Sequence, residues 1–155
     1  MQIKVDSREK KGVFLFSSYP DVEIVVKALK TGDYSLVGHE DKITIDRKAN
    51  SGELQMCFGA DWERFKKELD RMSLFEEAYI VCTFPEYDLD TFPVNSGIPK
   101  NRWFRLKTSG KFLRKRYHDI EQDYPNIKFI FCYSNQEAEQ KTYTLLKNYY
   151  DKANT

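Results

Sequence analysis

The feature that most constrains the fold is the stretch TGDYSLVGHEDKITIDRK, residues 31–48. It reads as two short strands joined by the polar loop Gly38–Asp41. If that loop holds no further residue, Asp33 lies opposite Asp46. Because side chains alternate across a strand, each face of this hairpin has its own character. The apolar face carries Tyr34, Leu36, Ile43 and Ile45 and belongs to a core, and the other carries Asp33, Ser35, Thr44, Asp46 and Lys48.

This pairing sets two carboxylates side by side. Directly opposite residues of an antiparallel pair have Cβ atoms about 5 Å apart, and like charges placed so are destabilising. A divalent cation between Asp33 and Asp46 would remove that cost, and carboxylate oxygens suit Mg²⁺, Mn²⁺ or Ca²⁺. The alternative is that these residues form the solvated face of an ordinary hairpin.

Length and composition indicate a single intracellular domain. The 155 residues suit one domain, 1–155, with a core of its own. No apolar run approaches the roughly 20 residues of a membrane span, and the N-terminus MQIKVDSREKK has no apolar signal segment. The three cysteines lack metal spacing, which fits a reducing compartment. We expect a cytoplasmic location, or a nuclear one in a eukaryote, and no membrane partner.

The order of the expected elements predicts an α/β fold. Strands are expected at residues 2–6, 22–29, 78–84 and 127–133 besides the hairpin, and helices at 61–72, 110–124 and 134–150. The alternation of strand and helix from residue 78 predicts parallel neighbours, whereas the first half predicts antiparallel strands. Asp61 is expected to cap the first helix, and Ser134 with Glu137 to form a capping box for the last. The sum is a mixed β-sheet flanked by helices.

Four residues of this sheet form a candidate catalytic set. Asp6 ends the first strand, Asp33 and Asp46 lie in the hairpin, and Lys48 shares a face with Asp46. Metal-dependent phosphodiester hydrolysis uses such a set, since carboxylates hold ions that activate water. A lysine then orients the water or neutralises developing charge. Glu9 could add a ligand or a base.

Three ordered motifs carry a resemblance to a known family. Val5–Glu9, Leu29–Tyr34 and Ile45–Lys48 look like the nuclease domain of the XPF family, a branch of the PD-(D/E)XK, restriction-endonuclease-like superfamily. The similarity continues through residues 65–84 and 127–146. It implies that Asp6, Asp33 and Asp46 are ligands of Mg²⁺ (or Mn²⁺) and that Lys48 is the catalytic lysine. Arg8 and Arg47 match the family's arginines, with a structural or phosphate-contacting role.

The chain departs from the family's pattern at three points. Asp46 stands where the family usually has Glu, and Gly52 stands where it has Asp. Glu53, one residue later, is the candidate substitute for that second acid. The family's tandem helix-hairpin-helix module is not expected, because the sequence ends soon after the last expected helix.

A basic segment, residues 100–118, carries eight Lys or Arg and no Asp or Glu, while the rest of the chain holds 17 basic and 24 acidic residues. This distribution favours a polyanionic partner. The candidate DNA contacts are Arg8 and Arg47 together with Lys100, Arg102, Arg105, Lys107, Lys111, Arg114, Lys115 and Arg116. Interleaved aromatics, Trp103, Phe104, Phe112 and Tyr117, could stack on an unpaired base. The alternative is a solvated helix whose aromatics face the core.

The sequence therefore predicts a metal-dependent DNA endonuclease acting on branched, flap or single-strand-containing DNA. A catalytically inactive module of the same fold, binding DNA or a protein, is the main alternative. A plain α/β interaction domain with a chance motif match is a third. DNA is the expected partner, and a homodimer or a protein partner stays open.

Overall fold

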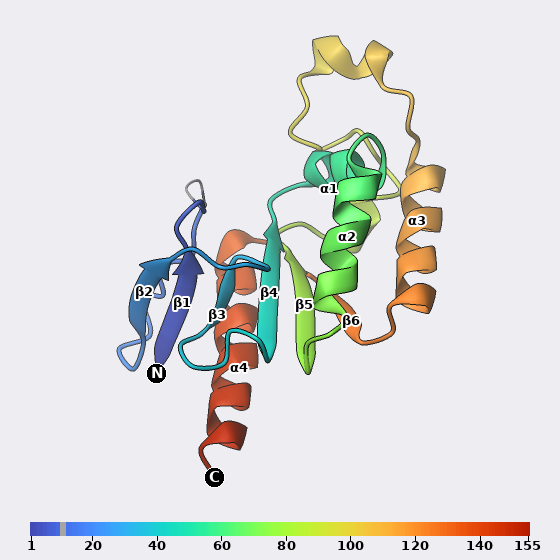
Figure 1. Ribbon diagram of the computed structural model, residues 1–155. Coiled ribbons are helices and arrows are strands. Elements are labelled where there is room, and N and C mark those ends of the chain that lie inside the picture. The colour runs from blue at the N-terminus through green and yellow to red at the C-terminus, as the bar shows by residue number, and fades with distance from the viewer. Residues whose placement is uncertain (10–11) are drawn as a thin grey trace.

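A computed structural model describes residues 1–9 and 12–155, and within them the chain forms a six-stranded mixed sheet in the order β2-β1-β3-β4-β5-β6 (Figure 1). The strands are β1 Gln2–Asp6, β2 Glu23–Lys27, β3 Tyr34–Leu36, β4 Ile43–Lys48, β5 Glu77–Cys82 and β6 Ile127–Phe131. The α-helices are α1 Ser51–Phe58, α2 Trp62–Met72, α3 Gly110–Asp123 and α4 Asn135–Ala153, and two 3-10 segments are η1 Glu86–Asp88 and η2 Lys100–Arg105. The α/β mixed sheet flanked by helices is as predicted.

The central hairpin has the predicted register. Tyr34 pairs with Ile45 across β3 and β4, which sets the preceding Asp33 opposite Asp46. The connection between the strands is longer than predicted, because β3 ends at Leu36 and β4 begins at Ile43. All six residues of β4 are buried, so neither face of this strand is solvated and the alternative of an ordinary exposed hairpin face is wrong.

The strand directions agree with the sequence except at β2. The neighbours β5 and β6 are parallel as predicted, β4 is also parallel to β5, and β3 is antiparallel to both β1 and β4. The edge strand β2, however, is parallel to β1, so the expectation of antiparallel strands throughout the first half is wrong. Phe14 and Phe16, which lie between these two strands in the chain, are buried in the core. The chain therefore crosses a face of the sheet before β2 begins.

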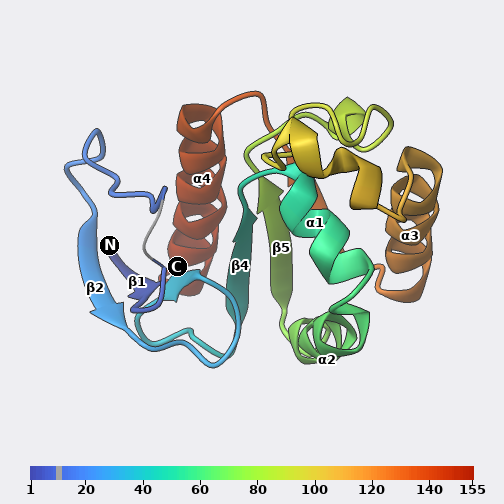
Figure 2. The same ribbon diagram turned by 90° about the horizontal axis from the view of Figure 1, so that it is seen from above.

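The sheet separates two hydrophobic cores. On one face α4 packs through Ala138, Leu146 and Tyr149 against Tyr34, Leu36, Ile43 and Ile45, the predicted apolar face of the hairpin. On the other face α1, α2 and α3 pack against Ala78, Ile80 and Cys82 of β5. Figure 2 shows α4 on the opposite side of the strands from α1 and α2. None of the helices in the described residues is long and apolar enough to cross a membrane.

The helix starts show one correct and one incorrect capping prediction. Ser134 accepts a hydrogen bond from the Glu137 N–H at 3.1 Å, as a capping residue does, although the Glu137 carboxylate accepts from Tyr133 N–H rather than from Ser134. Asp61 precedes α2 but makes no capping bond. Its carboxylate instead accepts from Arg64 at 2.9 Å, so the prediction of a side-chain cap at Asp61 is wrong.

We expect Ser134→Ala to lower the free energy of unfolding by about 1 kcal/mol, because the Glu137 N–H loses its acceptor. Urea unfolding followed by circular dichroism measures this change. Asn148→Ala, at an exposed position in the middle of the same helix, is the control and should not lower stability. Equal stabilities of wild type and Ser134→Ala would show that the cap contributes nothing.

Candidate active site

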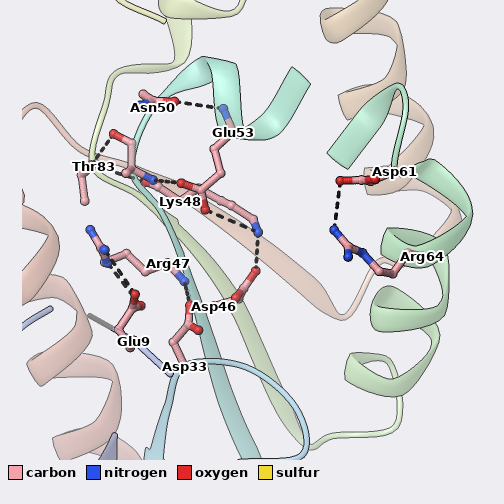
Figure 3. Close-up of polar contacts among 11 residues, drawn as sticks. Glu9, Asp33, Asp46, Arg47, Lys48, Asn50, Glu53, Asp61, Arg64 and Thr83 are labelled. Atoms are coloured by element: carbon pink, nitrogen blue, oxygen red, sulfur yellow. Dashed lines mark hydrogen bonds and ion pairs between the residues drawn. The ribbon is translucent and has the colours of Figure 1, made fainter. Parts of the chain in front are cut away.

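The candidate active site lies where the end of β4 meets the turn before β3. Gly32 in that turn has a φ of +76°, and a Cβ there would come within 2.1 Å of Thr44 Oγ1. Only glycine tolerates both the positive φ and this close approach. The Asp33 N–H donates to Ile45 O at 2.8 Å. These contacts hold Asp33 against β4, beside Asp46 (Figure 3).

Asp33 and Asp46 form a closely coupled pair of carboxyl groups. Burial raises the pKa of Asp33 far above its usual range, and the charge of Asp46 and a hydrogen bond between the two carboxyl groups raise it further. The Arg47 N–H, donating to Asp33 Oδ2 at 2.8 Å, opposes this rise in pKa without cancelling it. Asp46 itself is 8% exposed. Without a cation, the pair therefore favours a state that keeps a proton.

Lys48 is on the same face as Asp46, as predicted. Its Nζ lies 3.0 Å from Asp46 Oδ2 and 3.9 Å from Glu53 Oε1, and 5.4 Å from the centre of the Phe65 ring. Burial by itself lowers the pKa of Lys48, but the charge of Asp46, with smaller contributions from Cys57 and Glu53, outweighs burial and raises it. Lys48 is therefore an ammonium ion at neutral pH and acts as a donor and a positive charge.

The structure explains why Gly52 replaces an acid at this position. Gly52 N–H donates to Ser96 O at 3.1 Å, and a Cβ on Gly52 would lie 2.4 Å from that same oxygen. No side chain fits there while the loop at Ser96 keeps its place. Glu53 instead turns toward Lys48 and accepts from the Ala49 N–H at 3.1 Å. Glu53 thus supplies a carboxylate near the lysine, and its role as the substitute for the acid that the family resemblance implies stays a prediction.

Asp6 is directed to other partners. Its carboxylate is 5% exposed and accepts from Leu29 N–H at 2.9 Å and from Arg8 Nε at 3.0 Å. Arg8 also donates to Leu29 O at 2.7 Å, so both residues fasten the end of β1 to the segment after β2. Within residues 1–9 and 12–155 no three His, Cys, Asp or Glu side chains are arranged to hold a metal ion. The structure therefore sets the carboxyl groups of Asp33 and Asp46 against each other, whereas Asp6, whose backbone N–H donates to Asp33 O at 2.8 Å, keeps its carboxylate on Arg8 and the Leu29 N–H.

Glu9 and Arg47 lie together on the opposite face of β4. Arg47 NH2 is 3.4 Å from Glu9 Oε1, and its guanidinium lies 5.7 Å from the centre of the Phe14 ring. Asp46 and Lys48 point to the face covered by α2, whereas Arg47, one residue away from each, points to the α4 face. Glu9 is therefore paired with Arg47 and not with Lys48, although its charge still contributes to the raised pKa of Asp33. Figure 3 shows Glu9 and Arg47 on one side of β4 and Asp46 and Lys48 on the other.

A cleft of about 250 Å³ lies between the Asp46 and Lys48 side chains of β4 and helix α2. Besides Asp46 and Lys48, its wall includes Arg64, Glu68 and Arg71. Arg64 and Arg71 are the cationic side chains of this wall that sequence reasoning missed. The apolar stripe of α2 predicts that both arginines lie beside the core-facing side of the helix. It does not show that this side faces β4, because that depends on how α2 packs against the sheet.

The basic segment divides into two parts. Arg114 pairs with Glu86 and Asp90, Lys115 pairs with Asp119 at 3.0 Å, and Arg116 lies 3.8 Å from the centre of the Trp62 ring. Across the part of the chain that the structure describes, no ion pair engages the other five cations, Lys100, Arg102, Arg105, Lys107 and Lys111. These five therefore keep their charge available to a partner, whereas Arg114 and Lys115 are already neutralised.

We expect the metal-free protein to lose stability as the pH rises from 5 to 8. The folded-state pKa of Asp33 is raised above its unfolded value, so the native state keeps a proton that the unfolded state releases. The slope is at most about 1.4 kcal/mol per pH unit for one proton. Asp33→Asn keeps an acceptor for Arg47 N–H but cannot titrate, so it should become the more stable protein as pH rises.

Urea unfolding in EDTA at several pH values measures this difference. Asp41→Asn, in the exposed loop of the hairpin, is the control and should follow the wild-type curve. If the difference in free energy of unfolding between wild type and Asp33→Asn stayed constant from pH 5 to 8, this result would contradict a raised pKa at Asp33.

Comparison with known proteins shows similarity in structure. No model of a known protein family matches the sequence, and no curated protein matches it. The solved structure of XPF from Aeropyrum pernix in complex with DNA matches with a TM-score of 0.62 and 20% identity, over 97% of this chain and 65% of that chain. A structure of XPF from Aeropyrum pernix matches with a TM-score of 0.62 and 21% identity, over 95% and 64%. This chain thus spans about 65% of the length of the structures it matches. The protein therefore has the mixed-sheet fold of XPF, as the sequence resemblance predicted.

Proposed function

We propose that the protein is a metal-dependent endonuclease that hydrolyses phosphodiester bonds in DNA. The observation that carries the proposal is the coupled pair Asp33 and Asp46, with Lys48 3.0 Å from Asp46, in a sheet that has the fold of XPF. A buried and a partly buried carboxyl group in contact, beside one ammonium group, are costly as a purely structural arrangement. The same groups would have a function in a site that binds a metal cation and a phosphate, because the carboxylates would bind the cation and the ammonium group would bind the phosphate.

The residues present fit a hard divalent cation. Asp33 and Asp46 offer carboxylate oxygens, and Mg²⁺ is commonly held by one or two carboxylates together with water and substrate phosphate. We assign the Mg²⁺ (or Mn²⁺) to this pair, because Asp6 would have to release Arg8 and the Leu29 N–H to join it. When bound, such an ion polarises the phosphate and lowers the pKa of a water molecule.

The chain's own groups have separate tasks in this proposal. The protonated Lys48 places a positive charge in the wall of the cleft, where it would donate to a phosphate oxygen as negative charge develops. Glu53 and Asp46 hold the Lys48 ammonium from two sides. Arg64 and Arg71, on the α2 wall of the cleft, are paired with Asp61 and Glu68 and would have to exchange these partners to contact phosphates beside the reacting one.

Support for DNA as the substrate comes from charge and from similarity. One of the matching structures is XPF in complex with DNA, and residues 100–111 of this chain carry five cations that form no ion pair with the residues that the structure describes. We propose branched, flap or single-strand-containing DNA as the substrate. Gly52 is the observation that favours the second candidate, an inactive DNA-binding module, since the acid that the family resemblance leads one to expect there is missing.

We expect Asp46→Asn and Lys48→Ala each to reduce the rate of DNA cleavage by about 100-fold or more. Labelled duplex, flap, fork and junction DNA, incubated with Mg²⁺, Mn²⁺ or EDTA, provide the assay. Asp41→Asn serves as the matched control and should cleave at the wild-type rate. Binding of these DNAs without cleavage under either metal would establish the inactive module, and cleavage that persists in EDTA would exclude the metal.

We expect the triple variant Lys100→Ala, Arg102→Ala and Arg105→Ala to weaken DNA binding and to make it less dependent on salt. Each phosphate contact contributes about 0.9 to the slope of log K against log salt concentration, so the slope should fall by about 2 to 3. Fluorescence anisotropy at several salt concentrations measures the slope. Lys115→Ala is the control, because Asp119 already pairs with that charge. An unchanged slope in the triple variant would place the DNA elsewhere.

A further inference from the structure

The segment η2 presents one large aromatic side chain to solvent. None of the residues Lys100–Arg105 is buried, and Phe104 is 79% exposed. The other aromatics of the basic segment are used in packing. Tyr117 is 7% exposed, and Phe112 packs against the core that α1, α2 and α3 cover. Phe104 is therefore the aromatic of this segment that is available to a partner.

The segment is anchored so that Phe104 keeps its outward position. The neighbouring Trp103 donates from Nε1 to Ile98 O at 3.0 Å. Ile98 and Leu106, on either side of η2, both pack against the hydrophobic core. Figure 1 shows η2 above α1, at the end of the molecule toward which β4 points. The carboxylate pair and Lys48 lie near that same end of β4.

Positive charge surrounds the Phe104 ring. Lys100, Arg102 and Arg105 share the 3-10 segment with it, and no carboxylate of residues 1–9 or 12–155 forms an ion pair with any of them. The Arg105 guanidinium lies 5.3 Å from the centre of the Phe104 ring. A partner that carries flat apolar rings on a polyanionic chain matches both features, and single-stranded nucleic acid is such a partner.

We propose that Phe104 stacks on an unpaired base of DNA while Lys100, Arg102 and Arg105 contact the neighbouring phosphates. This inference rests on the proposed function, because it assumes that DNA is the substrate. A base inside a continuous duplex has no free face for the ring, whereas a base beside a duplex end or branch does. Phe104 would thus make the protein prefer DNA that contains a single-stranded segment.

The test compares binding to two DNAs in EDTA, where no cleavage can occur. One is a duplex with a single-stranded tail, and the other is a covalently closed duplex circle, which has neither an end nor an unpaired base. We expect Phe104→Ala to weaken binding of the tailed duplex by about tenfold, as the loss of one stacked base does. Phe104→Leu should weaken it similarly, and Phe104→Tyr should bind as wild type. Leu74→Ala, which removes another exposed apolar side chain, should have no effect.

A double-mutant cycle identifies the stacked base. Abasic sites are introduced one at a time along the tail, and one of them should weaken wild-type binding without weakening Phe104→Ala further. The stacking proposal would be overturned if, at every position of the tail, the losses of binding free energy from the abasic site and from Phe104→Ala were additive. Binding of the tailed duplex by Phe104→Leu at the wild-type affinity would overturn it as well. Wild-type protein that cleaves DNA but is insensitive to Phe104 substitution refutes this inference alone. Wild-type protein that binds none of the DNAs refutes the proposed function as well.

Discussion

The close approach of Asp33 and Asp46 is the constraint on which the rest of the site depends. The antiparallel register of β3 and β4 sets them opposite each other, and burial and mutual repulsion raise the pKa of Asp33. The surrounding contacts reduce the repulsion between the two carboxyl groups but do not remove it. Arg47 N–H donates to Asp33, and the Lys48 ammonium lies against Asp46. A divalent cation would complete the compensation.

The parts of the site that the sequence predicts are those set by local geometry. Alternation along β4 places Asp46 and Lys48 on one face, and the polar loop of the hairpin sets the register of Asp33. Neither requires knowledge of distant residues. The Ser134 cap and the parallel pairing of β5 with β6 are local in the same sense, because they follow from neighbouring elements in the chain.

The parts that sequence reasoning missed depend on contacts between distant segments. That Asp6 is a metal ligand stays a prediction, but the sequence does not show the contact of the Asp6 carboxylate with the Leu29 N–H, in the segment after β2. Glu9 faces the other side of β4 because its partner is Arg47. The charges at Arg114 and Lys115 are neutralised by acids, which a count of basic residues does not reveal. Gly52 shows the same dependence, since the loop at Ser96 leaves no room for a side chain.

The most direct test of the carboxylate pair as a metal site is anomalous diffraction from crystals of the protein soaked in Mn²⁺. We predict an anomalous peak within bonding distance of carboxylate oxygens from both Asp33 and Asp46, with Asp6 still bound to Arg8 and Leu29 N–H. Mn²⁺ bound elsewhere, with a direct contact between the two carboxyl groups preserved, would contradict this assignment. In that case the aspartate pair would be a protonated structural contact and not a metal site.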